Sequence, residues 1–328
     1  VVSFEASEPR VLHRVSAHSC EIQCISWIPA HIASTDFART GGALVCTSSK
    51  DKTFKFWSLT SSEPHLSFSL PGLKKRGNAQ ASQGQNRERV WLTHAWVNGN
   101  VLISTTHNGE LLRWTFNKLS PPKSVYAPDS GRAQAVFSIC LVSSAENNTT
   151  GITVSSDRQM TLWDLNELKP IVRLPTIGGS VYDVHESPHD LGAVAMACGD
   201  SLVRIWHTDT THAASYCKSI WKGMQGRAHS VAWHPKNEDL LAYGLEDGTV
   251  GVYDLLKDKY FACKSHNKHP EAVTSLQWGA GNSPTLYACS EDGSVIGHEN
   301  LKSPSSTKPM DVIAVVKTSR PPEMASPK

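Results

Sequence analysis

The sequence predicts an all-β fold, a WD-repeat β-propeller, on three observations. First, one unit recurs six times along the 328 residues: an apolar strand ending near Trp, a small-residue strand, a polar turn, and a strand that ends in an aromatic ring. Second, the closing residues lie 57, 49, 43, 47 and 45 residues apart, close to the ~40–45 residues of WD-type repeats. Third, each polar turn holds Asp, Asn or Gly, which tolerate the positive φ of tight hairpins. The closing residues are Trp57, Trp114, Trp163, Trp206, Tyr253 and, in a weaker last copy, His298.

The fifth copy shows the elements of one unit most clearly. Its first strand runs through Ser230-Val-Ala-Trp233 and stops at Pro235, its second strand covers 240–244, its turn 246–248 and its third strand 250–254. Short β-branched runs separated by turns every ~8–12 residues are typical of all-β folds, and a fixed period indicates a propeller. We therefore expect each unit to be one four-stranded blade that buries its faces against its neighbours.

The two ends of the chain differ from this pattern. Residues 10–15 resemble the outer strand of a preceding blade. The six recognisable blades are therefore expected to form either a six-bladed propeller or, as we favour, an incomplete piece of a seven-bladed ring, which would expose two apolar blade faces. The polar stretch 74–89 is expected to be a long loop between blades. We assign 1–302 to the propeller and 303–328 to a Ser/Pro/Lys-rich, largely disordered tail, apart from a strand expected at 312–316.

Composition excludes several classes of protein. The formal net charge is +2, from 32 Lys and Arg against 30 Asp and Glu, so any polyanion must be bound through local contacts rather than net charge. The eight cysteines lack the spacing of a disulfide framework. There is no signal-like segment and no apolar run near the ~20 residues that span a bilayer. We expect a soluble, intracellular protein without a membrane partner.

No catalytic or metal-binding motif is present. The sequence lacks Gly-x-Ser-x-Gly, a phosphate-binding Gly-x4-Gly-Lys loop and His-Glu-x-x-His, so we expect no enzyme and no cofactor. Cys20 and Cys24 form a close pair without the further ligands that a metal site needs. His18, His234 and His298 recur at blade positions, where a structural hydrogen bond to Asp or Ser is the expected role.

The blade repeat places certain residues around one opening of the predicted channel. All first strands begin at the same mouth, and the turns between second and third strands open on that face. Residues four before the end of each first strand are Gln23, Leu92, Phe137, Tyr182, His229 and Thr274; residues six before it are Glu21, Val90, Ala135, Ser180, Arg227 and Ala272. Trp91 is one step off the first set, and a one-residue bulge would bring it into register.

These positions suggest a surface for RNA. Trp91, Phe137 and Tyr182 offer aromatic rings on three consecutive blades, with Arg158 as a cation in a turn on the same face. Unpaired bases stack on such rings for about 1–3 kcal/mol each, which needs no large positive charge. Glu21 could accept hydrogen bonds from a base edge. The alternative is that the rings pack between blades, and that the basic cluster 74–76 is a solvated loop and not a phosphate contact.

Several segments resemble the gem-associated protein 5 family of WD-repeat proteins. They are Leu70-Pro-Gly-Leu-Lys-Lys-Arg-Gly77, Glu88-Arg-Val-Trp-Leu-Thr93, Gly109-Glu-Leu-Leu-Arg-Trp114 and Ser48-Ser-Lys-Asp-Lys-Thr53, and the resemblance runs through nearly all of 10–300. The resemblance implies that the chain is related to the RNA-recognising subunit of the survival-of-motor-neuron (SMN) complex. Such a subunit binds small nuclear RNA at the single-stranded, U-rich Sm site and the 7-methylguanosine cap, not DNA. The implied process is spliceosomal snRNP assembly, with SMN-complex proteins as partners, in the cytoplasm and in nuclear bodies.

The family's RNA-contacting residues fall on the positions reached above. By resemblance the contacts are Trp91, Phe137, Tyr182, Arg158 and Glu21. Three positions depart from the family pattern, with the loss of a phosphate partner and two stacking surfaces: Gln134, Ser180 and Thr274. The other hypothesis is a WD-repeat protein-interaction scaffold without RNA. A ubiquitin-ligase receptor is disfavoured, because the sequence after Trp163-Asp164 is Leu-Asn, without the Arg of that motif.

Overall fold

The computed structural model describes most of the predicted strands. The described residues are 2–3, 10–11, 15–28, 44–59, 61–71, 91–98, 100–106, 109–116, 123–126, 135–142, 149–208, 217–263, 267–279, 285–299 and 311–317. The chain divides into two compact units, unit 1 mainly from Val11–Pro175 and unit 2 mainly from Thr176–Lys328. Each unit is described by itself.

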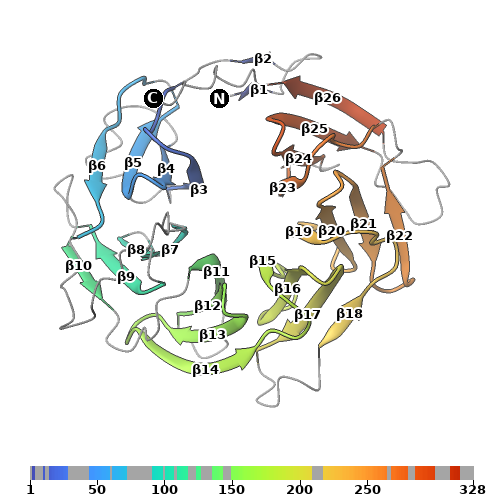
Figure 1. Cartoon of the computed structure of the whole chain (residues 1–328), viewed down its shortest axis with the longest axis horizontal. Helices are drawn as coiled ribbons and strands as arrows, with labels where there is room; N and C mark the ends of the chain where they lie inside the picture. Colours follow the sequence, from blue (N-terminus) through green and yellow to red (C-terminus); the bar gives the residue numbers. More distant parts are fainter. Residues whose placement is uncertain are drawn as a thin grey trace, which may run out of the picture. The chain divides into compact units, whose positions relative to one another are not determined.

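Unit 1 holds three antiparallel four-stranded sheets whose strands are paired in sequence order (Figure 1). The first sheet contains β3 (Ile22–Trp27), β4 (Leu44–Ser49), β5 (Thr53–Ser58) and β6 (Leu66–Ser69). The second contains β7 (His94–Asn98), β8 (Val101–Thr105), β9 (Leu111–Thr115) and β10 (Lys123–Tyr126). The third contains β11 (Val136–Val142), β12 (Thr150–Ser155), β13 (Gln159–Asp164) and β14 (Lys169–Pro175).

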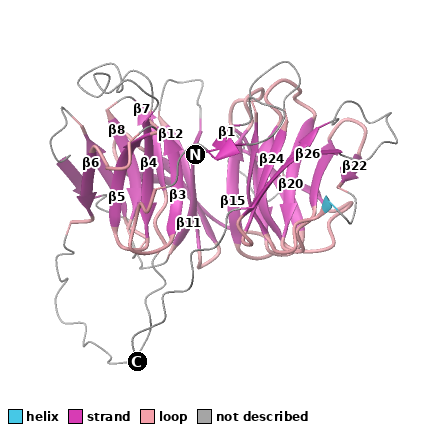
Figure 2. Ribbon diagram, turned by 90° about the horizontal axis from the view of Figure 1, so that it is seen from above, coloured by secondary structure: helices cyan, strands magenta, loops and turns pink. Residues whose placement is uncertain are grey.

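Unit 2 repeats the arrangement with three further sheets, and Figure 2 shows the described elements of both units to be almost entirely strands and loops. Its first sheet contains β15 (Val181–Glu186), β16 (Ala193–Cys198), β17 (Leu202–His207) and β18 (Lys218–Ile220). The next contains β19 (Ala228–Trp233), β20 (Leu240–Leu245), β21 (Val250–Asp254) and β22 (Lys259–Ala262). The last contains β23 (Val273–Trp278), β24 (Leu286–Ser290), β25 (Ser294–Glu299) and β26 (Asp311–Lys317). The predicted six blades of a WD-repeat propeller are confirmed.

The ends of the chain are described in part. The strand expected at 312–316 is β26, which pairs with β25 and so places 311–317 in the sixth blade. Of the segment 10–15, Arg10–Val11 forms β2, which pairs with β1 (Val2–Ser3) in a separate two-stranded sheet. Membership of a seven-bladed ring stays a prediction. The loop 74–89 and the tail residues 303–310 and 318–328 lie outside the described residues.

The turn between the second and third strands has the same backbone in every blade. One residue of each turn has a positive φ between 62° and 81°, the left-handed region predicted from the sequence. These residues are Lys52, Gly109, Arg158, Ser201, Gly248 and Gly293. In three blades an Asp carboxylate also accepts the amide two residues later, as at Asp247 and Thr249 (3.0 Å), which fixes the turn.

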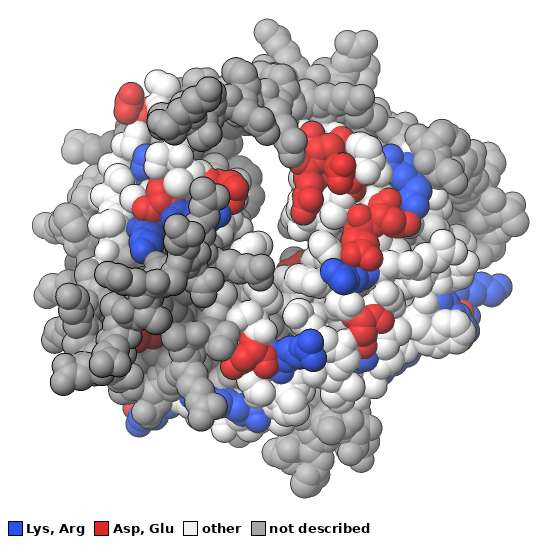
Figure 3. All heavy atoms as spheres, in the orientation of Figure 1, with Lys and Arg blue, Asp and Glu red and all other residues white. Residues whose placement is uncertain are grey.

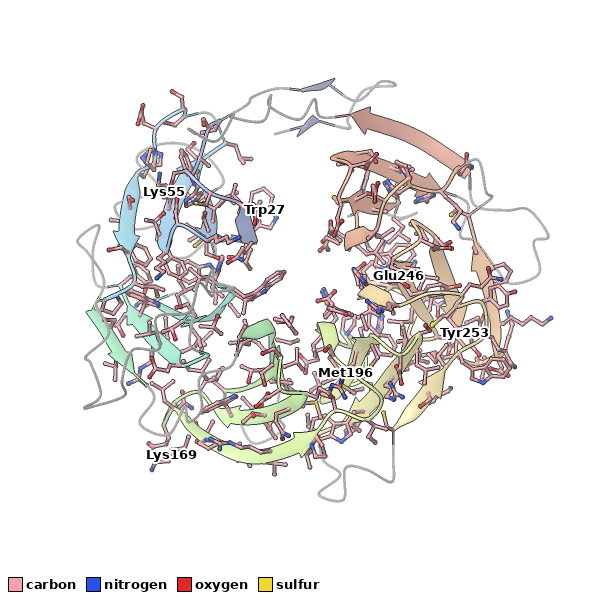
Figure 4. All side chains as sticks on the ribbon, in the orientation of Figure 1. Trp27, Lys55, Lys169, Met196, Glu246 and Tyr253 are labelled. Atoms are coloured by element: carbon pink, nitrogen blue, oxygen red, sulfur yellow. The ribbon has the colours of Figure 1, made fainter. Side chains whose placement is uncertain are left out.

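A side-chain bond joins the third strand to the second in every blade of unit 1. The indole Nε1 donates to a hydroxyl on the neighbouring strand in the pairs Trp57–Thr47, Trp114–Ser104 and Trp163–Thr153, at 2.9, 2.8 and 2.8 Å. In the first blade of unit 2 the same indole, Trp206, is buried, and its Nε1 has no partner among the described residues. The register explains this, because Met196 (Figure 4) stands where the other blades carry Ser or Thr.

The core consists of apolar clusters between consecutive blades of a unit. In unit 1, Phe54, Phe56 and Phe68 of the first blade meet Trp114 and Phe116 of the second, with ring centroids 4.9–5.8 Å apart. In unit 2 the residues of β16 and β20 are all buried. Each sheet therefore buries its faces against a neighbour, as the repeat predicts. No helix in the described ranges has the length and apolar character needed to cross a bilayer.

The three recurring histidines have different environments. His18 bonds Asp51 and Thr53 through Nδ1, both at 3.0 Å, which agrees with the expected structural role. His234 Nδ1 instead accepts backbone amides in its own turn. His298 is fully buried, and neither ring nitrogen has a partner in the described part of the chain. The expected bond to Asp or Ser is therefore wrong for His298 within the described residues.

Candidate nucleic-acid interface

A β-bulge marks the start of the first strand in five blades. The register between first and second strands shifts by one residue there, which leaves one residue of the first strand without a partner across the ladder. The bulged residues are Gln23, Phe137, Tyr182, His229 and Thr274. They are the residues that the sequence places four before the end of each first strand, so this predicted set has a common structural cause.

The residue two before each bulge is tied to the turn of the same blade. Its carbonyl accepts the amide of a turn residue at 2.8–3.0 Å in the same five blades. The pairs are Glu21–Lys50, Ala135–Ser156, Ser180–Gly199, Arg227–Glu246 and Ala272–Glu291. The bulge and the turn between second and third strands therefore lie at one end of each sheet, which we call the bulge end.

At the start of the first strand, the second blade differs by one residue from the other blades in which position is exposed and which is buried. Leu92 is fully buried, as Val136 and Val181 are before their bulges, and Trp91 is 39% exposed. The Thr93 amide donates to the Thr105 hydroxyl and the Thr93 carbonyl accepts the Thr105 amide, both at 3.0 Å, which sets the register. Trp91 is thus exposed one residue before Leu92, but the register shift of β7 lies between Trp96 and Asn98, so the bulge expected beside Trp91 is not seen in the described pairs.

Trp91 and Phe137 come together at the bulge end of unit 1. The Trp91 Nε1 donates to the backbone carbonyl of Phe137 at 2.9 Å. The two ring centroids are 5.7 Å apart with an interplanar angle of 86°, an edge-to-face pair. The indole edge that carries Nε1 therefore points to the backbone of Phe137. The two side chains form a fixed aromatic corner between neighbouring blades.

Tyr182 belongs to unit 2 and pairs with a different residue. Its ring lies 4.6 Å from that of His229, at an interplanar angle of 34°, so that one face of Tyr182 is covered by the imidazole. Gly199 lies against the ring edge, because a Cβ there would be 3.2 Å from Cε2. Burial lowers the pKa of His229, which favours the neutral ring in this stack. Sequence reasoning included His229 in the aligned positions but did not assign it to the site.

A contact between bulge-end residues of adjacent blades recurs in unit 1. The Gln23 amide oxygen of the first blade accepts the backbone amide of Leu92 in the second, at 2.7 Å. Trp91 of that blade then bonds the third through Phe137. Bulge-end side chains therefore position one another across blades, a coupling that residue types alone do not reveal.

The charged residues of unit 1 at this end are mixed in sign. Arg158 is exposed in its turn. Glu21 is exposed too, and its carboxylate is 3.5 Å from Lys50 Nζ, an ion pair open to solvent. At such an exposed site the pair contributes little to stability. Both Glu21 and Arg158 therefore lie at the bulge end with the Trp91–Phe137 corner.

Unit 2 presents mainly carboxylates at its bulge end. Glu246 (labelled in Figure 4) lies 3.6 Å from Arg227, and Asp247 lies 2.6 Å from Lys268. Figure 3 shows acidic side chains gathered over this part of unit 2, where Glu271 and Glu291 are also exposed. An acidic surface repels phosphate, so unit 2 suits contacts with base edges more than with the RNA backbone.

Two of the three departures from the family pattern can be located. Ser180 is partly buried and bonds the turn through its carbonyl. Thr274 is exposed at the last bulge, where its hydroxyl donates to the Cys289 carbonyl at 3.3 Å. Neither side chain offers a ring to a base. Gln134 lies outside the described residues.

The cysteines and histidines are not arranged as a metal site. All eight cysteines are free thiols. Cys20 is exposed, whereas Cys24 packs on His94, its Sγ 3.7 Å from the His94 carbonyl. His94 is buried between Ser26 and Ser48, which bond its two ring nitrogens. Among the residues that the structure describes, no three His, Cys, Asp or Glu side chains gather as a metal ion would require.

Comparison with known proteins finds relatives of the chain in three organisms. A human protein named gem-associated protein 5 is 29% identical over 331 residues, which cover 89% of the chain and 22% of that protein. The mouse protein of that name is 30% identical with the same coverage. A Dictyostelium discoideum protein named component of gems protein 5 is 24% identical over 74% of the chain and 23% of its own length. The chain thus spans less than a quarter of each of these relatives, and no family model matches it. The chain is a WD-repeat propeller protein that is similar, over most of its length, to gem-associated protein 5.

Proposed function

We propose that the chain is a non-enzymatic protein that binds single-stranded RNA at the bulge ends of its blades. The observation that carries this proposal is the exposed Trp91–Phe137 corner, held by a 2.9 Å hydrogen bond and an edge-to-face contact. An aromatic ring fixed at a surface offers its face to a base without losing side-chain freedom on binding. In unit 2, Tyr182 supplies a further ring, with His229 stacked behind it.

The charged side chains at the bulge ends suit contacts with the phosphates and base edges of RNA, in addition to the stacking of bases on the aromatic rings. In unit 1, Arg158 is exposed at the bulge end of the third blade, and Lys50 is exposed in the turn of the first blade. These cations suit phosphate oxygens. Glu21 and, in unit 2, Glu246 are acceptors for the N–H groups of base edges. With so few cations, we expect stacking to supply most of the affinity and the salt dependence to be shallow.

The biological setting is part of the same proposal. The human and mouse relatives are named as gem-associated proteins and the Dictyostelium relative as a component of gems. We therefore propose small nuclear RNA as the ligand, with its U-rich Sm site and its cap as the recognised parts. The proposed process is spliceosomal snRNP assembly with SMN-complex proteins, and the proposed location is the cytoplasm and the nucleus, including nuclear bodies.

A scaffold without direct RNA binding is the second candidate. It is favoured by the absence of rings at Ser180 and Thr274 and by the covered face of Tyr182. In this case the bulge-end rings would serve to join blades. RNA would then be found with the chain only through other proteins.

Fluorescence anisotropy with a labelled U-rich Sm-site oligonucleotide separates the two candidates. Each lost stack removes about 1–3 kcal/mol, so Trp91→Ala and Tyr182→Ala should each weaken binding about 5- to 150-fold. Trp91→Phe, which keeps a ring but loses the bond to Phe137, should have a smaller effect. The matched control is Ile171→Ala, an exposed apolar side chain on the fourth strand β14. Equal affinity of Trp91→Ala, Tyr182→Ala and the control would favour the scaffold.

A further inference from the structure

Unit 2 carries a second exposed apolar surface, formed by residues of and next to the outermost strands β18 and β22 of two neighbouring blades. Trp221 follows β18 and is 64% exposed, Leu256 in the turn before β22 is 75% exposed, and Tyr260 in β22 is 48% exposed. We call Trp221, Leu256 and Tyr260, with the lysines around them, the β18–β22 patch. Large apolar side chains that share one part of a surface are typical of interaction sites.

The patch is rigid because two blades hold each other there. The turn after β18 closes through a bond from the Met224 amide to the Trp221 carbonyl, at 3.2 Å. Gly223 of this turn has φ +80° and presses against the Tyr260 ring, where a Cβ would come within 2.3 Å of Cδ2. Lys222 bonds the Asp258 carboxylate of the next blade. Trp221 is therefore presented from an ordered segment, which is how binding anchors at interfaces are arranged.

Positive charge surrounds these apolar side chains. The segments 217–223 and 254–260 contain Lys218, Lys222, Lys257 and Lys259 but only Asp254 and Asp258 as carboxylates. Both aspartates are engaged, since Asp254 is buried and caps the Lys257 amide and Asp258 holds Lys222. Lys218 reaches the Leu255 carbonyl at 3.3 Å. The patch thus has an excess of cations and suits an acidic partner.

A strand edge borders the patch. β22 is the last strand of its sheet in the described part of the chain, and Figure 1 shows it with β18 along the same side of unit 2. Such an edge offers backbone N–H and C=O groups to an added strand. An extended acidic peptide therefore fits this patch better than RNA does. Leu256 offers no ring on which a base could stack, and RNA has no backbone that could continue a sheet.

We propose that the β18–β22 patch docks an extended acidic peptide segment of a partner protein, which pairs with β22 and covers Trp221. Alternate residues of the peptide would contact the patch, with aliphatic side chains on Trp221 and Leu256 and carboxylates beside Lys257 and Lys259. This site is independent of the RNA surface proposed above.

Titration of the full chain with a fluorescein-labelled peptide of alternating Glu and Val tests the proposal. We expect saturable binding, weakened at least fivefold by Trp221→Ala and by the charge reversal Lys259→Glu, and unchanged by Ile171→Ala on the corresponding fourth strand β14. Exposed residues are chosen so that the variants fold, which circular dichroism checks. Amides of β22 should become protected from hydrogen exchange when the peptide binds.

Three results would overturn the proposal. The first is binding no tighter than that of a peptide of alternating Lys and Val. The second is peptide binding that Trp221→Ala does not weaken. The third is a U-rich oligonucleotide that binds in a Trp221-dependent way while the acidic peptide does not, which would make the patch a nucleic-acid site.

Discussion

Thr47 lies at the centre of a hydrogen-bond relay that joins three segments of the first blade. Its hydroxyl accepts Trp57 Nε1–H at 2.9 Å and lies 2.8 Å from His18 Nε2. His18 Nδ1 is 3.0 Å from the Asp51 carboxylate. Burial by itself raises the Asp51 pKa, but bonds from Thr53 and His18 outweigh it and lower the pKa to about 2. The ionised carboxylate only accepts, so His18 carries its proton on Nδ1 and its Nε2 accepts from the Thr47 hydroxyl.

The substitution Thr47→Val removes this hydroxyl with almost no change of shape. Two polar atoms, Trp57 Nε1 and His18 Nε2, then lose their partners at a site where Thr47 is 6% exposed. A buried unsatisfied group costs about 1–3 kcal/mol, so we expect Thr47→Val to lower the free energy of unfolding by about 2–4 kcal/mol. Thr47→Ser keeps the hydroxyl and loses one methyl group, for about 1 kcal/mol.

Urea unfolding followed by far-UV circular dichroism measures both variants. Hydrogen exchange of β4 and β5 reports whether the loss is local to the first blade. The reasoning is refuted if Thr47→Val and Thr47→Ser agree within about 0.5 kcal/mol, a difference below that of a single hydrogen bond.

Three further predictions concern other blades. Met196→Thr gives the buried Trp206 indole an acceptor, so it should be about 1 kcal/mol more stable than Met196→Val in urea unfolding. Arg158 has φ 62°, so Arg158→Gly should be about 1 kcal/mol more stable than Arg158→Ala, which keeps the backbone strain; equal midpoints would contradict this. Burial lowers the pKa of His298 to about 4. In the unfolded chain the imidazole takes up a proton near pH 6.5, so the free energy of unfolding should fall by up to about 3 kcal/mol as the pH drops from 6.5 to 4. A pH series of urea unfolding midpoints measures this fall, and His298→Phe should lack it.

The repeated blade could be predicted from the sequence because its signals are local. Closing aromatics such as Trp114, and turn pairs such as Asp247-Gly248, recur at a fixed spacing and report strand ends and turns directly. The turn residue with positive φ lies within the predicted pair in four blades, whereas in the first and fourth blades it is Lys52 and Ser201, one step after Lys50-Asp51 and Gly199-Asp200. Five of the six aligned positions at the bulge end share a bulge, as at Phe137, whereas Leu92 of the second blade does not.

Contacts between blades could not be predicted in the same way. That Trp91 bonds Phe137 depends on where two strands 46 residues apart come to lie. The pairing of Tyr182 with His229, which covers one ring face, depends likewise on packing between blades. The expected bond of His298 failed for a related reason, because no described residue packed around its ring supplies a hydrogen-bond partner.

Photocrosslinking tests most directly whether bases stack on the bulge-end rings. A U-rich oligonucleotide carrying 4-thiouridine at successive positions is irradiated with the full chain, and the crosslinked residues are identified by mass spectrometry. The account predicts crosslinks at Trp91, Phe137 and Tyr182. In the Trp91→Ala variant the crosslink at position 91 should be lost. Crosslinks that fall instead on the fourth strands of the blades, or none at all at saturating RNA, would contradict it.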